Sequence, residues 1–145
     1  MNQKLYKLGI DIGSTTVKIA ILDEQDHLIF SDYERHFANI QETLSNLLHK
    51  AFDTTGEIMV SPMITGSGGL TLAKHLDIDF VQEVIAVSTA LTHYAPQTDV
   101  AIELGGEDAK IIYFENGNVE QRMNGICAGG TIHTLFYVSV LEIND

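Results

Sequence analysis

The stretch LGIDIGSTTVKIAILD, residues 8–23, decides the expected fold because it places a polar turn between two strand-like runs. Residues 5–12 and 16–23 are rich in Leu, Ile and Val, which is typical of β-strands joined as an antiparallel hairpin. The polar residues of the turn region are Asp11, Gly13, Ser14, Thr15 and Thr16. Such a turn either only closes the hairpin or binds phosphate, and this segment alone favours the two interpretations equally.

The rest of the chain predicts an α/β fold with a ribonuclease-H-like mixed sheet flanked by helices. Apolar residues at helical spacing in residues 38–52 indicate an amphipathic helix after the first strands. The other expected elements are strands at 27–34, 57–66, 99–106, 109–117 and 118–125 and helices at 70–76 and 81–95. Three antiparallel strands that lead into a helix and a further strand are the pattern behind this prediction.

Composition excludes several classes of function. The chain has 145 residues and a formal net charge of −12, so it lacks the basic surface that a DNA- or RNA-binding protein needs. Its first residues lack a signal peptide, and no apolar run approaches the length of a membrane span. A single cysteine, Cys127, rules out an internal disulfide, and we expect a cytoplasmic protein.

The first hairpin has the chemistry of a phosphate site. A glycine turn lets main-chain N–H groups approach phosphate oxygens, and hydroxyl groups add further donors. Asp11 is suited to hold Mg²⁺ through water, and Lys18 on the second strand to neutralise phosphate charge. The alternative is a hairpin in which the aspartate and the hydroxyl groups only cap the turn.

A second hairpin, IELGGEDAK at residues 102–110, repeats this pattern. It carries two glycines and three acids, which are Gly105, Gly106, Glu103, Glu107 and Asp108. Acids alone repel a nucleotide, so the useful arrangement is one in which carboxylates hold Mg²⁺ and the Mg²⁺ holds phosphates. One carboxylate could instead orient an attacking water, and the plain alternative is a solvated acidic turn. Two such hairpins favour a shared nucleotide ligand.

Two further features are weaker. Cys127 lies in RMNGICAGGT (122–131), where we expect a helix to begin, and a helix N-terminus suits a thiol to metal ligation or redox chemistry. A lone cysteine is more often an inert buried residue, and one thiol cannot complete a four-cysteine cluster. The six histidines show no zinc-site spacing, and most of them are expected at the surface or on helix faces. ITGSGG (64–69) could be another ligand loop, but a strand-to-helix connection is favoured. Glu83 could face a cleft, but an acid in a first helical turn is favoured.

These motifs, in this order, resemble the activator ATPases of 2-hydroxyacyl-CoA dehydratases, a group that includes the ATPase subunits of benzoyl-CoA reductase. The match rests on GIDIGSTTVKIAILD, ITGSGG, IELGGEDAKIIYF and RMNGICAGGT, and it runs from about residue 5 to residue 131. The first hairpin alone would fit the whole superfamily of acetate and sugar kinases, Hsp70 and actin.

The resemblance implies one half of an actin-like ATPase fold, with a nucleotide cleft between two ribonuclease-H-like halves. It implies a homodimer that shares one [4Fe–4S] cluster and uses ATP and Mg²⁺ to pass a low-potential electron to a 2-hydroxyacyl-CoA dehydratase. Asp11, Glu103 and Glu107 are then the expected catalytic residues, with Asp11 and Glu103 at Mg²⁺ and Cys127 at the cluster. The expected nucleotide-binding residues are Gly13, Ser14, Thr15, Thr16, Lys18, Gly105, Gly106 and Asp108.

Three departures from the family pattern affect these expectations. Glu103 stands where many activators have Asp, and Thr131 is followed by Ile132 rather than by glycine. We therefore expect a nucleotide-binding subdomain at 1–131 and a divergent tail at 132–145. The expected second half and second cluster cysteine are absent, so we expect an inactive part of a longer protein. The alternatives are a phosphotransferase of the sugar- or acetate-kinase type and a non-catalytic module of the same fold.

Overall fold

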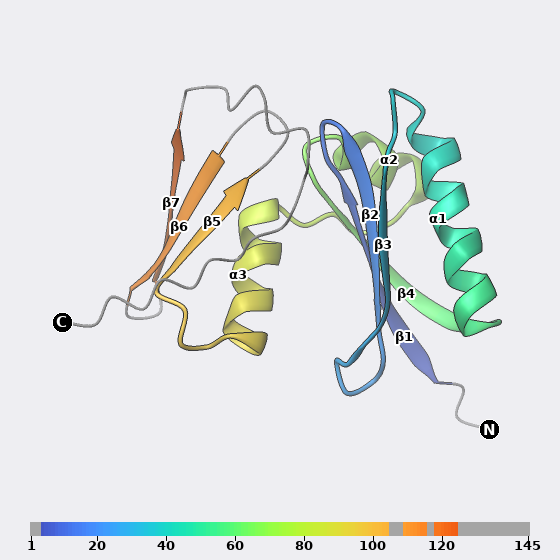
Figure 1. Ribbon diagram of the computed structural model, residues 1–145, viewed down its shortest axis with the longest axis horizontal. Helices are drawn as coiled ribbons and strands as arrows, with labels where there is room; N and C mark the ends of the chain where they lie inside the picture. Colours follow the sequence, from blue (N-terminus) through green and yellow to red (C-terminus); the bar gives the residue numbers. More distant parts are fainter. Residues whose placement is uncertain (1–3, 105–108, 116–117, 125–145) are drawn as a thin grey trace. The chain divides into compact units, whose positions relative to one another are not determined.

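The computed structural model describes residues 4–104, 109–115 and 118–124 and divides the chain into two compact units, residues 1–82 and 83–145 (Figure 1). Each unit has its own sheet and its own cluster of buried apolar side chains. In the part of the chain that is described, no helix is both long and apolar enough to cross a membrane.

The first unit contains a four-stranded sheet in the order β3-β2-β1-β4. Its strands are β1 (Leu5–Ile12), β2 (Thr16–Leu22), β3 (Leu28–Arg35) and β4 (Met59–Thr65). The first three pair antiparallel, whereas β4 runs parallel to β1 because α1 (Ile40–Thr55) carries the chain back to the starting edge. The predicted three antiparallel strands, crossover helix and further strand are confirmed.

The helices cover one face of this sheet. Alternate strand residues point toward them, and Ile12, Val17 and Ile64 are fully buried there. From α1, Leu44, Leu47 and Ala51 at helical spacing complete the cluster, and the short α2 (Gly69–Leu76) packs near β4. Burial of each large side chain contributes about 1.5–3 kcal/mol to stability.

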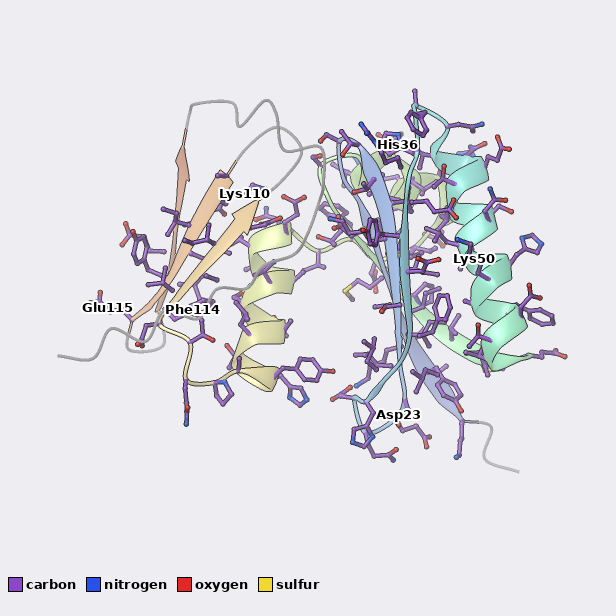
Figure 2. The ribbon with its side chains drawn as sticks, in the orientation of Figure 1. Asp23, His36, Lys50, Lys110, Phe114 and Glu115 are labelled. Atoms are coloured by element: carbon purple, nitrogen blue, oxygen red, sulfur yellow. The ribbon has the colours of Figure 1, made fainter. Side chains whose placement is uncertain are left out.

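An exposed ion-pair network also joins α1 to β3. Lys50 lies on the helix (Figure 2) and reaches both Asp32 and Glu34. These two acids are paired with the buried Ile19 and Val17 and so lie on the helix-covered side of the strand. Hydrogen bonding to Glu34, and then to Asp32, raises the pKa of Lys50 above its usual value. Because these groups are exposed to solvent, the network contributes little to the stability of the fold.

The second unit is a helix with a three-stranded antiparallel sheet in the order β5-β6-β7. Its elements are α3 (Glu83–Tyr94), β5 (Val100–Leu104), β6 (Ala109–Glu115) and β7 (Asn118–Asn124). Leu91, Ala101 and Ile112 form its buried cluster. These late strands form a sheet of their own, which hydrophobic periodicity cannot reveal because it identifies strands but not their partners. The expected boundary at residue 131 lies outside the described residues and stays a prediction.

The loop after β4 packs directly on the end of β1. The N–H group of Gly68 donates to the carbonyl oxygen of Ile12 at 2.9 Å. Gly66 has φ +98°, and a Cβ atom there would lie 2.3 Å from the Ile12 carbonyl oxygen and 2.5 Å from Asp11 Oδ1. Only glycine allows both this backbone conformation and this close approach.

Replacing Gly66 with Ala tests this contact. We expect Gly66→Ala to lower the free energy of unfolding by about 3 kcal/mol or more, because it combines left-handed strain with a steric clash. Gly56→Ala is the matched control, since Gly56 has φ +72° but nothing within 4 Å of a new Cβ atom. Urea unfolding followed by circular dichroism should show a smaller loss for the control, and equal losses would contradict the proposed clash.

Candidate phosphate-binding site

Three polar side chains form a row across the ends of β2, β1 and β4. Asp11 is paired in register with Lys18 on one side and with Thr65 on the other. Paired residues point to the same face of a sheet, and these three alternate with the fully buried Val17, Ile12 and Ile64. The row therefore lies on the sheet face opposite α1 and α2.

The two oxygens of Asp11 have different surroundings. Oδ2 accepts a hydrogen bond from Lys18 Nζ at 3.0 Å, and the two side chains are 26% and 18% exposed. Oδ1 is buried against the Gly66 loop, and within the described ranges neither it nor the buried Thr65 Oγ1 has a hydrogen-bond partner. Buried oxygens without partners are unusual in folded proteins and point to a ligand, an ion or water at this position.

The hairpin loop beside this row is open to an anion. Its closing bond runs from the Gly13 N–H group to the Thr16 carbonyl oxygen at 2.9 Å, and Ser14 at its tip is exposed. A Cβ atom at Gly13 would meet nothing closer than 3.4 Å, so the fold itself does not require glycine there. The absence of a side chain at Gly13 is therefore better explained by the approach of a ligand to the backbone.

His36 is a buried residue next to this hairpin that the sequence did not identify. It is 9% exposed at the end of β3 (Figure 2), and its Nε2 lies 3.1 Å from the carbonyl oxygen of Gly13. Its backbone N–H group donates to the carbonyl oxygen of Thr15 at 3.0 Å. It is an exception to the expectation that most histidines lie at the surface or on helix faces. A histidine directly after a strand carries no pattern that would have revealed the contact.

The second hairpin has the same register as the first. Glu103 on β5 is paired with Lys110 on β6, as Asp11 is paired with Lys18. Lys110 also forms an ion pair with Glu83 in the first turn of α3, within the second unit. The predicted site residues Gly105, Gly106, Glu107, Asp108 and Cys127 lie outside the described residues, so their roles stay predictions.

The residues of the first hairpin fit Mg²⁺ and phosphate better than a metal bound by protein alone. In the described part of the chain, no three His, Cys, Asp or Glu side chains gather to hold a metal. Mg²⁺ needs only one or two carboxylates because it keeps several waters and takes phosphate oxygens as ligands. The partnerless Asp11 Oδ1 and Thr65 Oγ1 and the open turn at Gly13 suit that arrangement.

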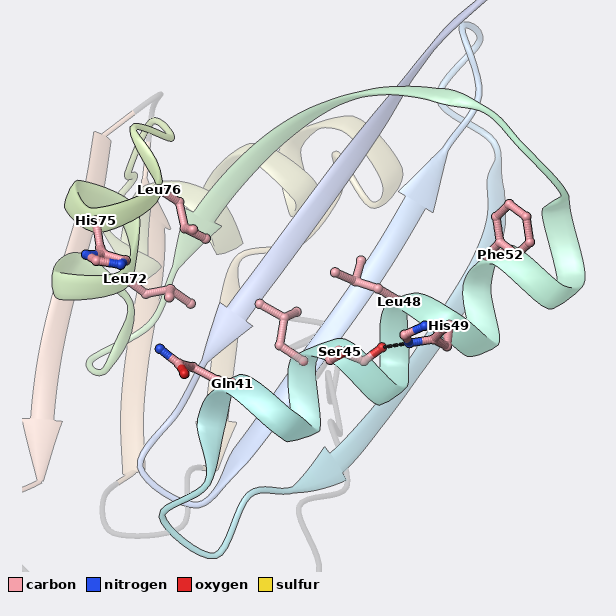
Figure 3. Close-up of a pocket in the computed structure, with 9 residues that line it drawn as sticks. Gln41, Ser45, Leu48, His49, Phe52, Leu72, His75 and Leu76 are labelled. Carbon is pink, nitrogen blue, oxygen red and sulfur yellow. Dashed lines mark hydrogen bonds between the residues drawn. The ribbon is translucent and has the colours of Figure 1, made fainter.

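A separate apolar groove of about 690 Å³ lies between α1 and α2 (Figure 3). Leu48, Phe52, Leu72 and Leu76 line it, with His49 and His75 among its few polar groups. Because the helices cover the opposite face of the sheet from Asp11, this groove is not part of the polar row.

Sequence comparison decides the family. The family model described as the BadF/BadG/BcrA/BcrD ATPase family matches residues 8–140, which include both hairpins. The chain belongs to this family. The matched residues extend past Thr131, and the divergence expected after that residue stays a prediction.

Two relatives of the chain are dehydratase activators. The (R)-2-hydroxyglutaryl-CoA dehydratase activating ATPase of Acidaminococcus fermentans is 30% identical over 148 residues, covering 96% of this chain and 55% of that protein. The 2-hydroxyisocaproyl-CoA dehydratase activator of Clostridioides difficile is 29% identical over 133 residues, covering 88% and 48%. The chain thus spans about half the length of these curated relatives.

Solved structures confirm the actin-like ATPase fold. Component A of the Acidaminococcus fermentans dehydratase has a TM-score of 0.72 at 22% identity, covering 83% of this chain and 47% of that one. The Clostridium difficile activator, solved with bound ADPNP, has a TM-score of 0.66 at 23% identity, with coverage of 81% and 46%. The α/β fold class expected from the sequence is confirmed.

Replacing Thr65 with Val tests whether its hydroxyl is retained for a ligand. A buried hydroxyl without a partner destabilises the fold, so Thr65→Val should raise the free energy of unfolding by about 1 kcal/mol. Thr43→Val is the matched control, because the buried Thr43 hydroxyl donates to the Asn39 carbonyl oxygen at 2.8 Å and its loss should destabilise. Urea unfolding without nucleotide measures both, and a similar loss in the two variants would argue against a partnerless hydroxyl.

Proposed function

We propose that the protein containing this chain binds ATP with Mg²⁺ and acts as an activator of a 2-hydroxyacyl-CoA dehydratase or a related CoA-ester reductase. The observation that supports it most directly is the polar row Lys18–Asp11–Thr65 beside an open glycine hairpin, in a chain of an ATPase family. The relatives that are dehydratase activators, one of them with a structure that holds ADPNP, support the same assignment.

In this proposal the first hairpin holds the phosphates. The Ser14 and Thr15 hydroxyls and the loop N–H groups would donate to phosphate oxygens, and the missing side chain at Gly13 leaves room for them. Asp11 Oδ1 would accept hydrogen bonds from Mg²⁺-bound water, while Lys18 holds Oδ2 in place. Bound Mg²⁺ would neutralise the charge that develops on the transferred phosphoryl group.

The second hairpin has the complementary role in the proposal. Glu103 and Glu107 supply carboxylates for Mg²⁺ and for orienting the attacking water, and Asp108 with Gly105 and Gly106 contributes to phosphate binding. The same register in both hairpins, Asp11 opposite Lys18 and Glu103 opposite Lys110, gives each hairpin a carboxylate at the matching position.

Electron transfer is the finer part of the proposal. Cys127, the single cysteine of the chain, would be one thiolate of a [4Fe–4S] cluster shared across a homodimer. Four thiolates are needed, so the remaining ligands come from the partner subunit and from sequence beyond this chain. ATP hydrolysis would then drive delivery of one low-potential electron to the dehydratase in the cytoplasm.

Nucleotide binding by the complete gene product tests the first part. We expect Asp11→Asn to weaken binding of Mg²⁺ with a non-hydrolysable ATP analogue by about ten-fold, because the neutral amide no longer orders Mg²⁺-bound water. Asp32→Asn is the control, since Asp32 is a strand aspartate paired with a lysine on the helix-covered face. Calorimetry should show unchanged affinity for the control, and equal affinities in all three proteins would refute the site.

The cluster is tested separately by Cys127→Ser. Anaerobically purified complete protein should lose its bound iron and its visible absorbance with this change, while it still binds Mg²⁺ and the ATP analogue. Iron retained by the variant would refute the cluster assignment without affecting the nucleotide site. A variant that still transfers phosphate to a small substrate would instead support the kinase alternative.

A further inference from the structure

His36 contacts the first hairpin at two positions from outside it. Its ring and its backbone N–H group reach two carbonyl oxygens of the turn, those of Gly13 at 3.1 Å and Thr15 at 3.0 Å. On the other side of the ring, Nδ1 accepts from the N–H group of Ala38 at 3.0 Å. The backbone carbonyl oxygen of His36 accepts from the N–H group of Asn39 at 2.6 Å. One buried residue therefore joins the hairpin to the turn that leads into α1.

The contacts fix the protonation of the ring. The Ala38 N–H group can only donate, so Nδ1 must carry a lone pair and not a proton. The proton of the neutral ring then sits on Nε2, which donates it to the carbonyl oxygen of Gly13. The orientation of the ring and its tautomer are thus both set by the turn at residues 37 and 38.

That turn is strained. Phe37 and Ala38 have φ values of +44° and +67°, a left-handed conformation that is unfavourable for residues other than glycine. Phe37 is 82% exposed, so burial of its ring does not offset the strain. Backbone strain that persists at a turn is a reason to look for a function.

The contact with Gly13 has a direct consequence for an anion. In a trans peptide the carbonyl group and the next N–H group point in opposite directions. With the Gly13 carbonyl held toward His36, the N–H group of exposed Ser14 must point away from the ring. Glycine offers little resistance to rotation of this peptide, and a rotated peptide would present a carbonyl oxygen to the phosphate.

We infer that His36 is a positioning residue that locks the Gly13–Ser14 peptide with its N–H group presented to a phosphate oxygen. This role rests on the proposed nucleotide function and adds to it a residue outside the phosphate hairpin. His36 acts through Gly13 and does not touch the ligand. The strained turn at Phe37 and Ala38 holds the ring in the orientation that this role requires.

Two substitutions separate the two halves of this role. In His36→Asn the amide oxygen takes the position of Nδ1 and accepts from Ala38, but nothing reaches Gly13. In His36→Gln the longer side chain places an amide N–H group near the position of Nε2, so the Gly13 contact is kept and the Ala38 contact is lost. His49→Asn, at an exposed site on α1, is the control.

Calorimetry with Mg²⁺ and a non-hydrolysable ATP analogue, and thermal unfolding without it, are measured on the complete gene product. We expect His36→Asn to weaken binding about five-fold with a small change in melting temperature. His36→Gln should melt earlier but bind within about two-fold of the unchanged protein. Equal losses of affinity in both variants, or none in His36→Asn, would overturn the inference.

The outcomes also distinguish this inference from the proposed function. If the unchanged protein does not bind the nucleotide, the proposed function fails and the inference fails with it. If the unchanged protein binds and the two variants behave alike, only the inference fails. Should His36→Asn unfold, Ala38→Gly is added to relieve the left-handed strain, and the restored protein must still show the loss of affinity.

Discussion

The approach of the Gly66–Gly69 loop to the end of β1 is the constraint on which the candidate site depends. The Gly68 N–H group binds the Ile12 carbonyl oxygen, and the missing side chain of Gly66 lets its backbone lie against Asp11. This contact fixes where β4 ends relative to β1, and so it sets Thr65 beside Asp11. β1 has hydrogen-bonded neighbours on both sides, so the carboxylate is held on a central strand of the sheet.

The sequence predicted most elements of the fold, because hydrophobic spacing and turn residues are local signals. The strands, the three helices and the polar hairpin at Asp11–Thr16 were all expected close to where they lie. Long-range contacts were not available from such signals. The loop at 64–69 was interpreted as a strand-to-helix connection in preference to a ligand loop, and its packing on Asp11 and Ile12 was not expected. The burial of His36 depends on the left-handed turn at residues 37 and 38, which nothing in those residue types predicts.

The two hairpins use the same register for different local purposes. In the first, Lys18 neutralises one oxygen of Asp11 across the strand pair. In the second, Lys110 lies opposite Glu103 but also pairs with Glu83, so it ties β6 to the start of α3. A lysine opposite an acid therefore does not by itself identify a phosphate ligand. A phosphate site at the first hairpin is supported by its open turn at Gly13 together with two buried oxygens that lack partners in the described part of the chain, Asp11 Oδ1 and Thr65 Oγ1.

Stability and function are separated within the first unit. The helix-covered face supplies the stability, through fully buried side chains such as Leu47 and Ile64 that carry no polar atoms. The unfavourable features gather at the ends of β1, β3 and β4, where two buried oxygens lack partners and Phe37 and Ala38 are strained. A fold selected for stability alone would have valine at Thr65 and glycine at Ala38. Each of these is a single substitution that would stabilise the fold. The strain at Ala38 and the unpaired hydroxyl of Thr65 are therefore best explained by a ligand that binds at this end of the sheet.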